Sequence, residues 1–528
     1  EEFNKLGGGG IGYYVPTERI PAFWKTAPHS SIGWDRVCKW MVNMSEENAT
    51  LERSVSWKQG MFIALGVPLL ILPSIGDVSS LVWGLCIVVW VVSVLQGFLQ
   101  NLAYGEMITC FPNATGLPGC AQAVFTDPNA TGGIDKGKFI GAFSAWCYWF
   151  AWTPVVAIFS MMIGDQLDMM FNFGLSGWAA VGYYLAIVLV IVIVMYFISA
   201  RGLEGGATVG TILALISMIP IIIILIGGLA AGMFHFDTIT AEFTAPGWSW
   251  SGSEIAILLG CFGLAQWSAC AWETAAIYGP EYKDPGKDTP KALFSCGFIC
   301  LIMYFFVSFV VYGCLGHDGI AAAGTATLKP IAEQAFGDIG GTIALIFLII
   351  AMILIVQTGF LGSSRTLFSM SGEKNLPAWF LKTNGHGMPV NCFLFVSIFN
   401  VLLVFIIEVS NFVLEQAAGA MTVLTASAMG YTIANGIALL AFVLTRRKPR
   451  FKDLERPFKA PRGWEIPISI MVIVQFCVFL PCLMYWSYTL MEGSDGIFRF
   501  IAIILGIIII LAFIPIWFTV QKKEAQKA

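Results

Sequence analysis

The sequence predicts an all-α polytopic membrane protein with twelve transmembrane helices. Hydrophobic residues make up 57% of the chain and charged residues only 12%, whereas soluble domains carry about a quarter charged residues. The mean hydropathy is +0.78. Apolar runs recur along the chain, and many reach the roughly 20 residues that a helix needs to cross a hydrocarbon core about 30 Å thick.

Taken in order, the apolar runs are separated by short polar breaks, and this pattern predicts one transmembrane domain over residues 44–528. The expected spans are 57–76, 79–103, 138–164, 178–199, 205–233, 253–278, 292–316, 340–368, 390–408, 418–445, 465–490 and 497–520.

Basic residues in the breaks predict the orientation, because Lys and Arg are retained on the cytoplasmic side. If the N-terminus is inside, almost all of them lie in cytoplasmic breaks, and only Lys329 and Arg499 lie outside. The cytoplasmic set is Lys136, Lys138, Arg201, Lys283, Lys287, Lys291, Lys374, Lys382, Arg446, Arg447, Lys448, Arg450, Lys452, Lys522 and Lys523. We therefore expect both termini in the cytoplasm.

Several functional classes receive no support from the sequence. The thirteen cysteines show no CxxC or CxxH spacing, and the four histidines fall in predicted breaks, so no metal site or haem bundle is expected. No P-loop, GxSxG or HExxH motif is present, which disfavours an enzyme. We expect no cofactor, no metal and no nucleic-acid partner; the lipid bilayer is the expected surrounding.

Residues 1–43 are predicted to be an N-terminal extension of undecided origin. The opening EEFNKLGGGG is a Gly-rich stretch typical of an added linker, and Met44 opens a segment typical of a natural start. Alternatively, the aromatic and basic residues of 11–43 form a segment lying at the cytoplasmic membrane interface.

Helix-breaking residues interrupt the first predicted span. Gly66, Pro68 and Pro73 lie within an otherwise apolar stretch, and a proline inside a helix removes one amide donor and frees a carbonyl. In lipid, the freed group needs a partner, so such backbone is tolerated where it is buried in protein or lines a cavity. The alternative is a kink that only shapes packing.

The sixth predicted span carries a matching interruption and an acidic residue. Small and polar residues broken by aromatics run from Cys261 to Ala271, just before Glu273. An ionisable side chain at membrane depth is costly and marks a functional site by default; a neutral or paired structural carboxyl is the alternative.

Interruptions in the first and sixth spans are typical of two inverted repeats of five helices, with the binding site where the broken helices meet. We expect the repeats at about 57–233 and 253–445, followed by two additional helices over 465–520. This is the architecture of a secondary transporter.

Several motifs resemble those of the amino acid, polyamine and organocation permeases. The most specific is Trp267–Pro290, similar to the family's sixth-helix pattern, with Trp267, Ser268, Glu273, Glu281, Pro285 and Pro290 at the matching places. Further pieces are AYGEM at 103–107, FPNATGLPGCAQAVF at 111–125, RGLEGGATVGTI at 201–212, SSRTLFSMSGEKNLP at 363–377 and RPFKAPRG at 456–463. The resemblance covers about 57–520 and implies a leucine-transporter-like fold in the plasma membrane, or the inner membrane of a bacterium.

The resemblance also implies where substrate binds. An amino acid or related amine is expected between the broken first and sixth helices, flanked by the third, eighth and tenth. The implied substrate-binding residues are Gly66, Val67, Pro68, Leu69, Trp152, Trp267, Ser268, Ala269, Ala271 and Gln357. The resemblance to the family's arginine/agmatine exchangers implies that Trp267 is expected to stack on substrate and that protonation of Glu273 is expected to be linked to conformational change. An indole that only packs within the bundle is the alternative for Trp267.

Two features leave the substrate and the coupling open. Val67 and Pro68 replace the family's bare glycine and serine amides in the first helix, which favours an amine or a carboxylate bound in another way. Ser363 and Ser364 resemble sodium ligands, although serines in membrane helices often bond their own backbone. Exchange or proton-coupled transport is preferred; a sodium symporter, a non-transporting sensor or scaffold, and a homodimer or accessory membrane partner stay open.

Overall fold

A computed structural model describes residues 53–127, 135–414, 421–489 and 496–527. Twelve helical segments in this part of the chain are long and apolar enough to cross a membrane, as the sequence predicts. They cover Trp57–Val82, Leu85–Cys110, Lys136–Phe171, Trp178–Ala200, Thr208–Ala230, Gly252–Glu281, Pro285–Ala323, Leu328–Gly372, Val390–Val413, Val423–Arg447, Glu465–Tyr485 and Ile503–Gln526; we number them spans 1 to 12. The predicted extension 1–43 lies outside the described residues.

The spans are built from the following helices. Spans 1 to 5 comprise α2 (Trp57–Ala64), α3 (Gly66–Leu69), α4 (Ile71–Val82), α5 (Leu85–Cys110), α7 (Lys136–Trp152), α8 (Val155–Phe171), α9 (Trp178–Ala200) and α10 (Leu203–Ala230), with the short α6 (Gly116–Phe125) and α11 (Phe236–Ala241) between spans. Spans 6 to 9 comprise α12 (Gly252–Ala269), the 3₁₀ helix η4 (Ala271–Glu281), α13 (Pro285–Ala323), α14 (Leu328–Gly372) and α15 (Val390–Leu414), with η5 (Ala378–Leu381) before α15. Spans 10 to 12 comprise α16 (Met421–Arg447), α17 (Glu465–Val474), the π-helix η7 (Gln475–Phe479), α18 (Leu480–Thr489) and α19 (Gly496–Lys527), with η6 (Pro449–Phe451) after α16.

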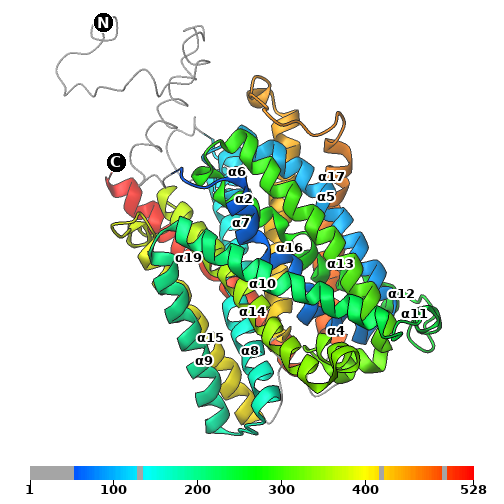
Figure 1. Cartoon of the computed structure of the whole chain (residues 1–528). Helices are drawn as coiled ribbons and strands as arrows, with labels where there is room; N and C mark the ends of the chain where they lie inside the picture. Colours follow the sequence, from blue (N-terminus) through cyan, green and yellow to red (C-terminus); the bar gives the residue numbers. More distant parts are fainter. Residues whose placement is uncertain (1–52, 128–134, 415–420, 490–495, 528) are drawn as a thin grey trace, which may run out of the picture. The chain divides into compact units, whose positions relative to one another are not determined.

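The helices pack as a central group surrounded by more exposed ones. The most apolar stretch of span 3 is fully buried and those of spans 1 and 10 are 83% buried, whereas those of spans 4 and 11 are 22% buried. The helix α16 packs on α7, α13 on α5 and α10 along α14, and α9 pairs with α15 at one side of the group (Figure 1). Spans 1, 3 and 10 therefore form the centre, where a binding site would be shielded from lipid.

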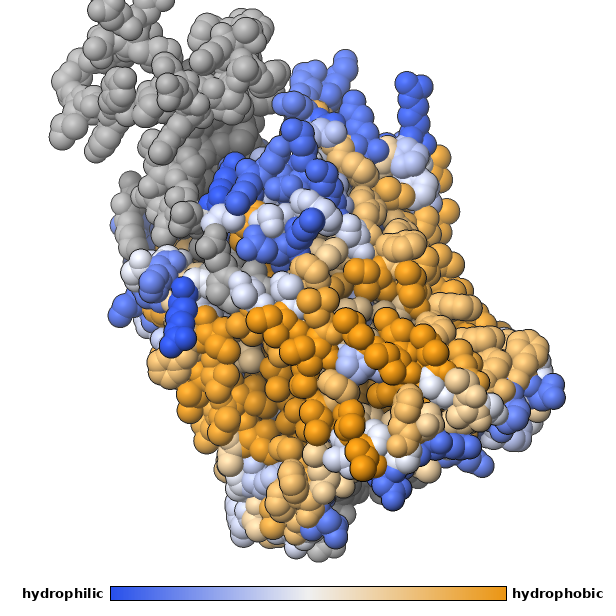
Figure 2. Space-filling view, in the orientation of Figure 1, coloured by the Kyte–Doolittle hydropathy of each residue, from blue (hydrophilic) through white to orange (hydrophobic). Residues whose placement is uncertain are grey.

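The face of the bundle seen in Figure 2 is apolar across its middle. Figure 2 shows a hydrophobic band, with hydrophilic residues gathered toward its two ends. Side chains such as Val190, Phe197, Ile219 and Ile223 on α9 and α10 are more than half exposed. An apolar belt of this kind is what a hydrocarbon solvent requires of the surface.

The predicted boundary between spans 1 and 2, at residues 77–78, is wrong. The helix α4 continues through this point, with the Ser80 hydroxyl donating to the Asp77 carbonyl oxygen at 2.8 Å. The chain turns instead at Trp83, whose φ is +51°. Polar residues that resemble a turn are accommodated here because Val78 and Ser79 are buried against other helices.

Other interruptions were not predicted. Span 3 is divided at Thr153 and Pro154 into α7 and α8, because proline offers no amide to continue the hydrogen-bond ladder. The helices α13 and α14 extend beyond the predicted bounds and bend at Gly316 and Gly337, whose φ angles of +64° and +75° favour glycine.

Two separate sequence motifs meet at the end of the bundle that the sequence predicts to be cytoplasmic. Glu106 of the AYGEM motif is fully buried and accepts hydrogen bonds from the guanidinium groups of Arg446 and Arg456. It also accepts from the Ala460 amide of the RPFKAPRG motif at 2.9 Å. These contacts fix the segment after α16 to the end of α5, because a buried carboxylate is stable only when charges and donors compensate it.

We predict that Glu106→Gln lowers the thermal stability of the purified protein. Removing the negative charge leaves two partly buried guanidinium groups without their shared partner, which costs about 3 to 5 kcal/mol in comparable buried pairs. Thermal unfolding in detergent measures the effect. The control is Glu465→Gln, which breaks only the more exposed pair with Arg446 at 3.4 Å and should cost less than about 1 kcal/mol. Equal melting temperatures for the two variants would contradict the proposed anchor.

Candidate functional site

The first span is interrupted where Gly66 and Pro68 predicted it. The helix α2 ends at Ala64 and the four-residue α3 lies between Leu65 and Leu70. Hydroxyl groups of other spans donate hydrogen bonds to backbone carbonyl oxygens here. Thr358 donates to the Ile63 oxygen at 2.7 Å, and Tyr304 donates to the Val67 oxygen at 3.2 Å. The interruption is therefore held from spans 7 and 8.

The α3 segment is buried and packs closely on its neighbours. Gly66, Val67, Pro68 and Leu69 are all buried, and α3 contacts α12, α13 and α14. A Cβ atom at Gly66 would lie 2.4 Å from the Thr358 hydroxyl oxygen and 3.0 Å from the Leu354 carbonyl oxygen. The glycine is needed for the close approach of span 1 to span 8.

The sixth span is interrupted at Cys270. The helix α12 ends at Ala269, and the chain continues as the 3₁₀ helix η4, in which i→i+3 bonds replace the α-helical pattern. The Asn101 side chain lies 3.5 Å from the Cys270 carbonyl oxygen, and Tyr282 donates to the Ala275 oxygen at 2.6 Å. This conformation places Ala271 and Glu273 on a tightly wound segment directly after α12.

Glu273 is a fully buried carboxyl group near the centre of the bundle. The Tyr148 hydroxyl of α7 donates to its Oε1 atom at 3.2 Å, while Oε2 has no hydrogen-bond partner within the described residues. The Tyr431 side chain of α16 also lies within electrostatic range of this carboxyl. No basic side chain pairs with Glu273 in this part of the chain, so the site can bind a cation or a proton.

Three aromatic side chains, each in contact with the next, extend from Glu273. The Trp267 indole donates to the Ala151 carbonyl oxygen at 3.0 Å, which fixes its ring. The Trp152 ring centroid lies 5.8 Å from that of Trp267 and 6.4 Å from that of Tyr148. Aromatic faces attract an ammonium or guanidinium group within about 6 Å of the ring centroid. The cluster of Trp152, Trp267, Tyr148 and Glu273, which we call the aromatic carboxyl cluster, therefore suits an organic cation.

The remaining predicted residues divide into those near this cluster and those elsewhere. Ser268 and Ala269 end α12 and Ala271 begins η4, all buried. Gln357 is buried on α14 and lies near Gly210 of α10. Ser363 donates to the Gly359 oxygen of its own helix at 2.7 Å, whereas the buried Ser364 hydroxyl has no hydrogen-bond partner among the described residues.

Tyr148 and Tyr431 were missed by the sequence reasoning. Tyr148 and Trp152 are four residues apart on α7, which places them on one helix face, and this spacing was the available signal for Tyr148. No comparable pattern surrounds Tyr431, whose role depends on how α16 packs against α7.

At the predicted cytoplasmic face, a buried ion pair joins span 6 to span 8. Arg365 of α14 contacts the Glu281 carboxylate with Nε–Oε1 at 2.6 Å, and its guanidinium lies 5.2 Å from the Tyr278 ring centroid. The backbone of Val55 pairs with the end of η4, donating to the Glu281 oxygen at 3.0 Å and accepting from the Lys283 amide at 2.9 Å. We call these contacts the cytoplasmic-side closure.

Opposite contacts close the predicted outer face. The Trp83 ring stacks on His317 with centroids 3.9 Å apart and planes 4° apart. The Glu242 carboxylate accepts from the His317 amide at 2.8 Å, and the Glu242 carbonyl accepts from Gly84 at 3.0 Å. These bonds join the turn after span 1 to the bend in span 7. All predicted substrate-binding residues are buried.

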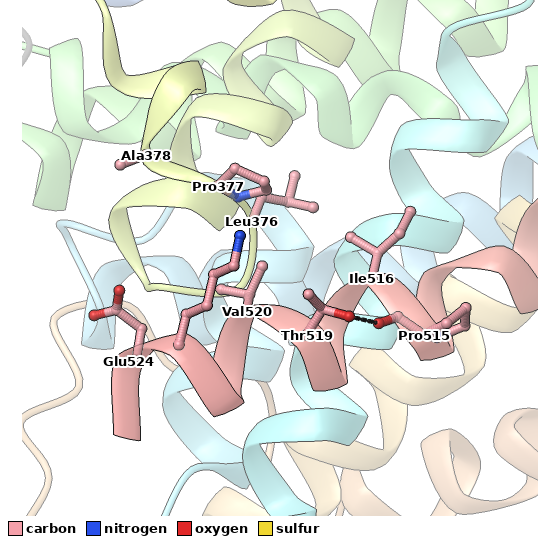
Figure 3. Close-up of a pocket in the computed structure, with 9 residues that line it drawn as sticks. Leu376, Pro377, Ala378, Pro515, Ile516, Thr519, Val520 and Glu524 are labelled. Atoms are coloured by element: carbon pink, nitrogen blue, oxygen red, sulfur yellow. Dashed lines mark hydrogen bonds between the residues drawn. The ribbon is translucent and has the colours of Figure 1, made fainter. Parts of the chain in front are cut away.

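A separate groove of about 520 Å³ lies between the start of η5 and α19 (Figure 3). Leu376, Pro377 and Ala378 form one wall, and α19 forms the other. None of the predicted substrate-binding residues lines it. Within the described residues, no group of three or more His, Cys, Asp or Glu side chains could hold a metal ion.

Comparison with known sequences places this arrangement in a family. The pattern of the amino acid permease family matches residues 55–516, which includes the aromatic carboxyl cluster and both closures. The chain belongs to the amino acid permease family. Members of this family are transporters and not enzymes, so this permease is a multi-pass membrane transporter protein.

Individual relatives are distant. An arginine/ornithine antiporter of Lactococcus lactis subsp. cremoris is 22% identical over 470 residues, covering 82% of this permease and 84% of the antiporter. A serine/threonine exchanger of Bacillus subtilis is 22% identical over 289 residues, covering 54% and 60% of the two chains. An uncharacterized amino-acid permease of Schizosaccharomyces pombe is 28% identical over 148 residues, which is 27% of each chain.

We predict that Glu281→Gln loosens the cytoplasmic-side closure locally. Without the carboxylate, the buried Arg365 charge loses its partner, and η4 is held less firmly against α14 and Val55. Hydrogen–deuterium exchange should quicken at Val55 and Lys283 by at least about tenfold, the factor given by 1.4 kcal/mol.

The control for this experiment is Glu333→Gln, which breaks an exposed pair with Lys329 and should leave both amides unchanged. Two outcomes would show that the ion pair does not act as a local closure. One is unchanged exchange at Val55 in Glu281→Gln; the other is an equal increase at Gly84, whose amide donates to Glu242 on the outer face.

Proposed function

We propose that this permease moves an amino acid or a related amine across the plasma membrane by alternating access, through exchange or proton-coupled transport. The observation that carries the proposal is Glu273, a buried carboxyl that receives one hydroxyl hydrogen bond and lies among Tyr148, Trp152 and Trp267 at the interruption of span 6. Intramembrane carboxyls of this kind are by default functional.

The proposed substrate orientation follows from the charges of the cluster. The ammonium or guanidinium group of the substrate would face the indole rings and Glu273, where cation–π attraction contributes about 0.5 to 2 kcal/mol. The other end would lie toward α3, where Pro68 has no amide hydrogen to offer. This geometry favours ligands in which the positive group provides most of the recognition.

The alternating-access part of the proposal rests on the two closures. Each closure joins elements far apart in sequence: Glu281 with Arg365 and Val55 on one face, and Trp83 with His317 on the other. A transporter exposes its site by opening one such closure at a time. We further propose that residues 57–233 and 253–445 are inverted repeats and that both termini lie in the cytoplasm.

The names of two relatives favour exchange as the transport mode. These names specify an arginine/ornithine antiporter and a serine/threonine exchanger. A sodium-coupled mechanism is disfavoured because the Ser363 hydroxyl donates within its own helix, the common arrangement for serine in membrane helices.

We predict that purified protein in proteoliposomes catalyses counterflow of at least one compound among L-arginine, L-ornithine, agmatine, L-serine and L-leucine. Counterflow is measured as uptake of the radiolabelled compound against a preloaded unlabelled pool, between pH 5.5 and 7.5. Glu273→Gln should lose the pH dependence of the wild-type rate, because the glutamine cannot exchange a proton.

Glu408→Gln is the matched control, since Glu408 is also a largely buried carboxyl in a span but lies outside the aromatic carboxyl cluster. It should retain the wild-type pH profile. A Glu273→Gln variant with an unchanged pH profile would exclude the proposed coupling role, and wild-type protein inactive on the whole panel would contradict the substrate class.

A further inference from the structure

Gln266, the residue before Trp267, is bound by side chains from three other spans. Its Nε2 atom donates to Gln475 Oε1 at 2.9 Å and to Thr432 Oγ1 at 3.1 Å. Its Oε1 atom accepts from Gln475 Nε2 at 2.7 Å and from Gln96 Nε2 at 3.1 Å. We call these four side chains the amide cluster; they connect spans 2, 6, 10 and 11.

The bonds between Gln266 and Gln475 form a reciprocal amide pair. Each side chain donates to the other and accepts from it, and both are completely buried. The four contacts use both amide hydrogens and both acceptor positions of Gln266. In a low-dielectric interior, a polar network of this completeness specifies one arrangement of the helices that contribute to it.

The backbone of span 11 is adapted to this contact. Gln475 begins the π-helix η7, and π-helical turns inside membrane helices change the direction of side chains and often mark functional positions. Two glycines of neighbouring spans allow this segment to approach closely. A Cβ atom at Gly263 of α12 would lie 3.2 Å from the Phe479 carbonyl oxygen, and one at Gly436 of α16 would lie 2.7 Å from the Phe476 ring.

The amide cluster is continuous with the aromatic carboxyl cluster through the backbone of α12. Gln266 is held by spans 2, 10 and 11, while the next residue, Trp267, is held by its bond to the Ala151 oxygen of span 3. The position of the indole ring therefore depends on anchors on two sides of α12. One of these anchors, Gln475, comes from a span that lies outside the two proposed repeats.

We infer that Gln475 is a positioning residue for substrate binding: its amide pair with Gln266 holds the end of α12 so that Trp267 and Glu273 face the same ligand. The inference rests on the proposed function of the aromatic carboxyl cluster. Span 11 thereby contributes to the affinity for the amino acid or amine without touching it.

The test is a counterflow experiment on Gln475→Met, which keeps the side-chain length and removes both bonds of the amide pair. We expect the KM to rise about threefold to tenfold, the range that corresponds to interhelical hydrogen bonds in membrane proteins, with the maximal rate reduced less than twofold. The substrate is the panel compound with the fastest wild-type counterflow. Cys477→Ala, in the same π-helix but facing outward, is the control and should keep the wild-type KM.

A double variant distinguishes positioning from general stability. Because Gln266→Met removes the same pair, Gln266→Met combined with Gln475→Met should raise the KM less than the product of the single effects. Thr432→Val provides a second variant if Gln475→Met does not fold, since it removes one acceptor of Gln266 and should also raise the KM, by a smaller factor.

The inference is overturned if the variant that folds has a wild-type KM, if only its maximal rate falls, or if the two glutamine effects multiply. These outcomes differ from a failure of the proposed function, in which wild-type protein shows no counterflow with any compound of the panel.

Discussion

Backbone carbonyl groups that lose their helical partners inside a membrane have to find donors within the protein, because the hydrocarbon core offers none. This requirement organises the centre of the permease. The Ile63 oxygen of the first span accepts a hydrogen bond from the Thr358 hydroxyl group, and the Ala275 oxygen of η4 accepts one from Tyr282. The Val67 oxygen keeps a backbone donor, the Leu70 amide at 3.0 Å, and also accepts from the Tyr304 hydroxyl group. Each of these hydrogen bonds connects an interrupted segment either to another helix or to the residue that follows the segment. The interruptions are consequently fixed in position, and they present Trp267 and Glu273 at one place.

Three buried carboxyl groups differ in their charged and hydrogen-bonding partners, and this difference distinguishes structural roles from functional ones. Glu106 is surrounded by two guanidinium groups and a backbone amide, so its charge is compensated and anchors the segment after α16. Glu281 is paired with one guanidinium, Arg365, across two spans that a transport cycle would have to separate. Glu273 receives a hydroxyl donor and pairs with no basic side chain in the part of the chain that the structure describes; in the proposed function it meets a proton or the positive group of a substrate.

The sequence predicts the twelve spans and the places where spans 1 and 6 are interrupted, because hydropathy, Gly66, Pro68 and the small residues before Glu273 act locally. It could not predict contacts that depend on packing. Gln266 and Gln475 lie 209 residues apart and Glu106 and Arg456 lie 350 apart, and no local pattern relates them. The turn at Trp83 was misplaced because polar residues at 77–80 resemble a break, although helix packing buries some of them. The π-helical turn at Gln475 likewise depends on neighbouring helices, in which Gly263 and Gly436 leave room for Phe479 and Phe476.

The central claim is that the ligand binds between α3 and the segment from Cys270 to Glu273. An electron cryo-microscopy structure of the purified permease with its fastest counterflow substrate at saturating concentration tests this most directly. We expect ligand density in contact with α3, with the positive group within about 6 Å of the Trp267 ring and beside Glu273. Density confined to another place, such as the groove between the start of η5 and α19, with Trp267 and Glu273 free of ligand, would contradict this position.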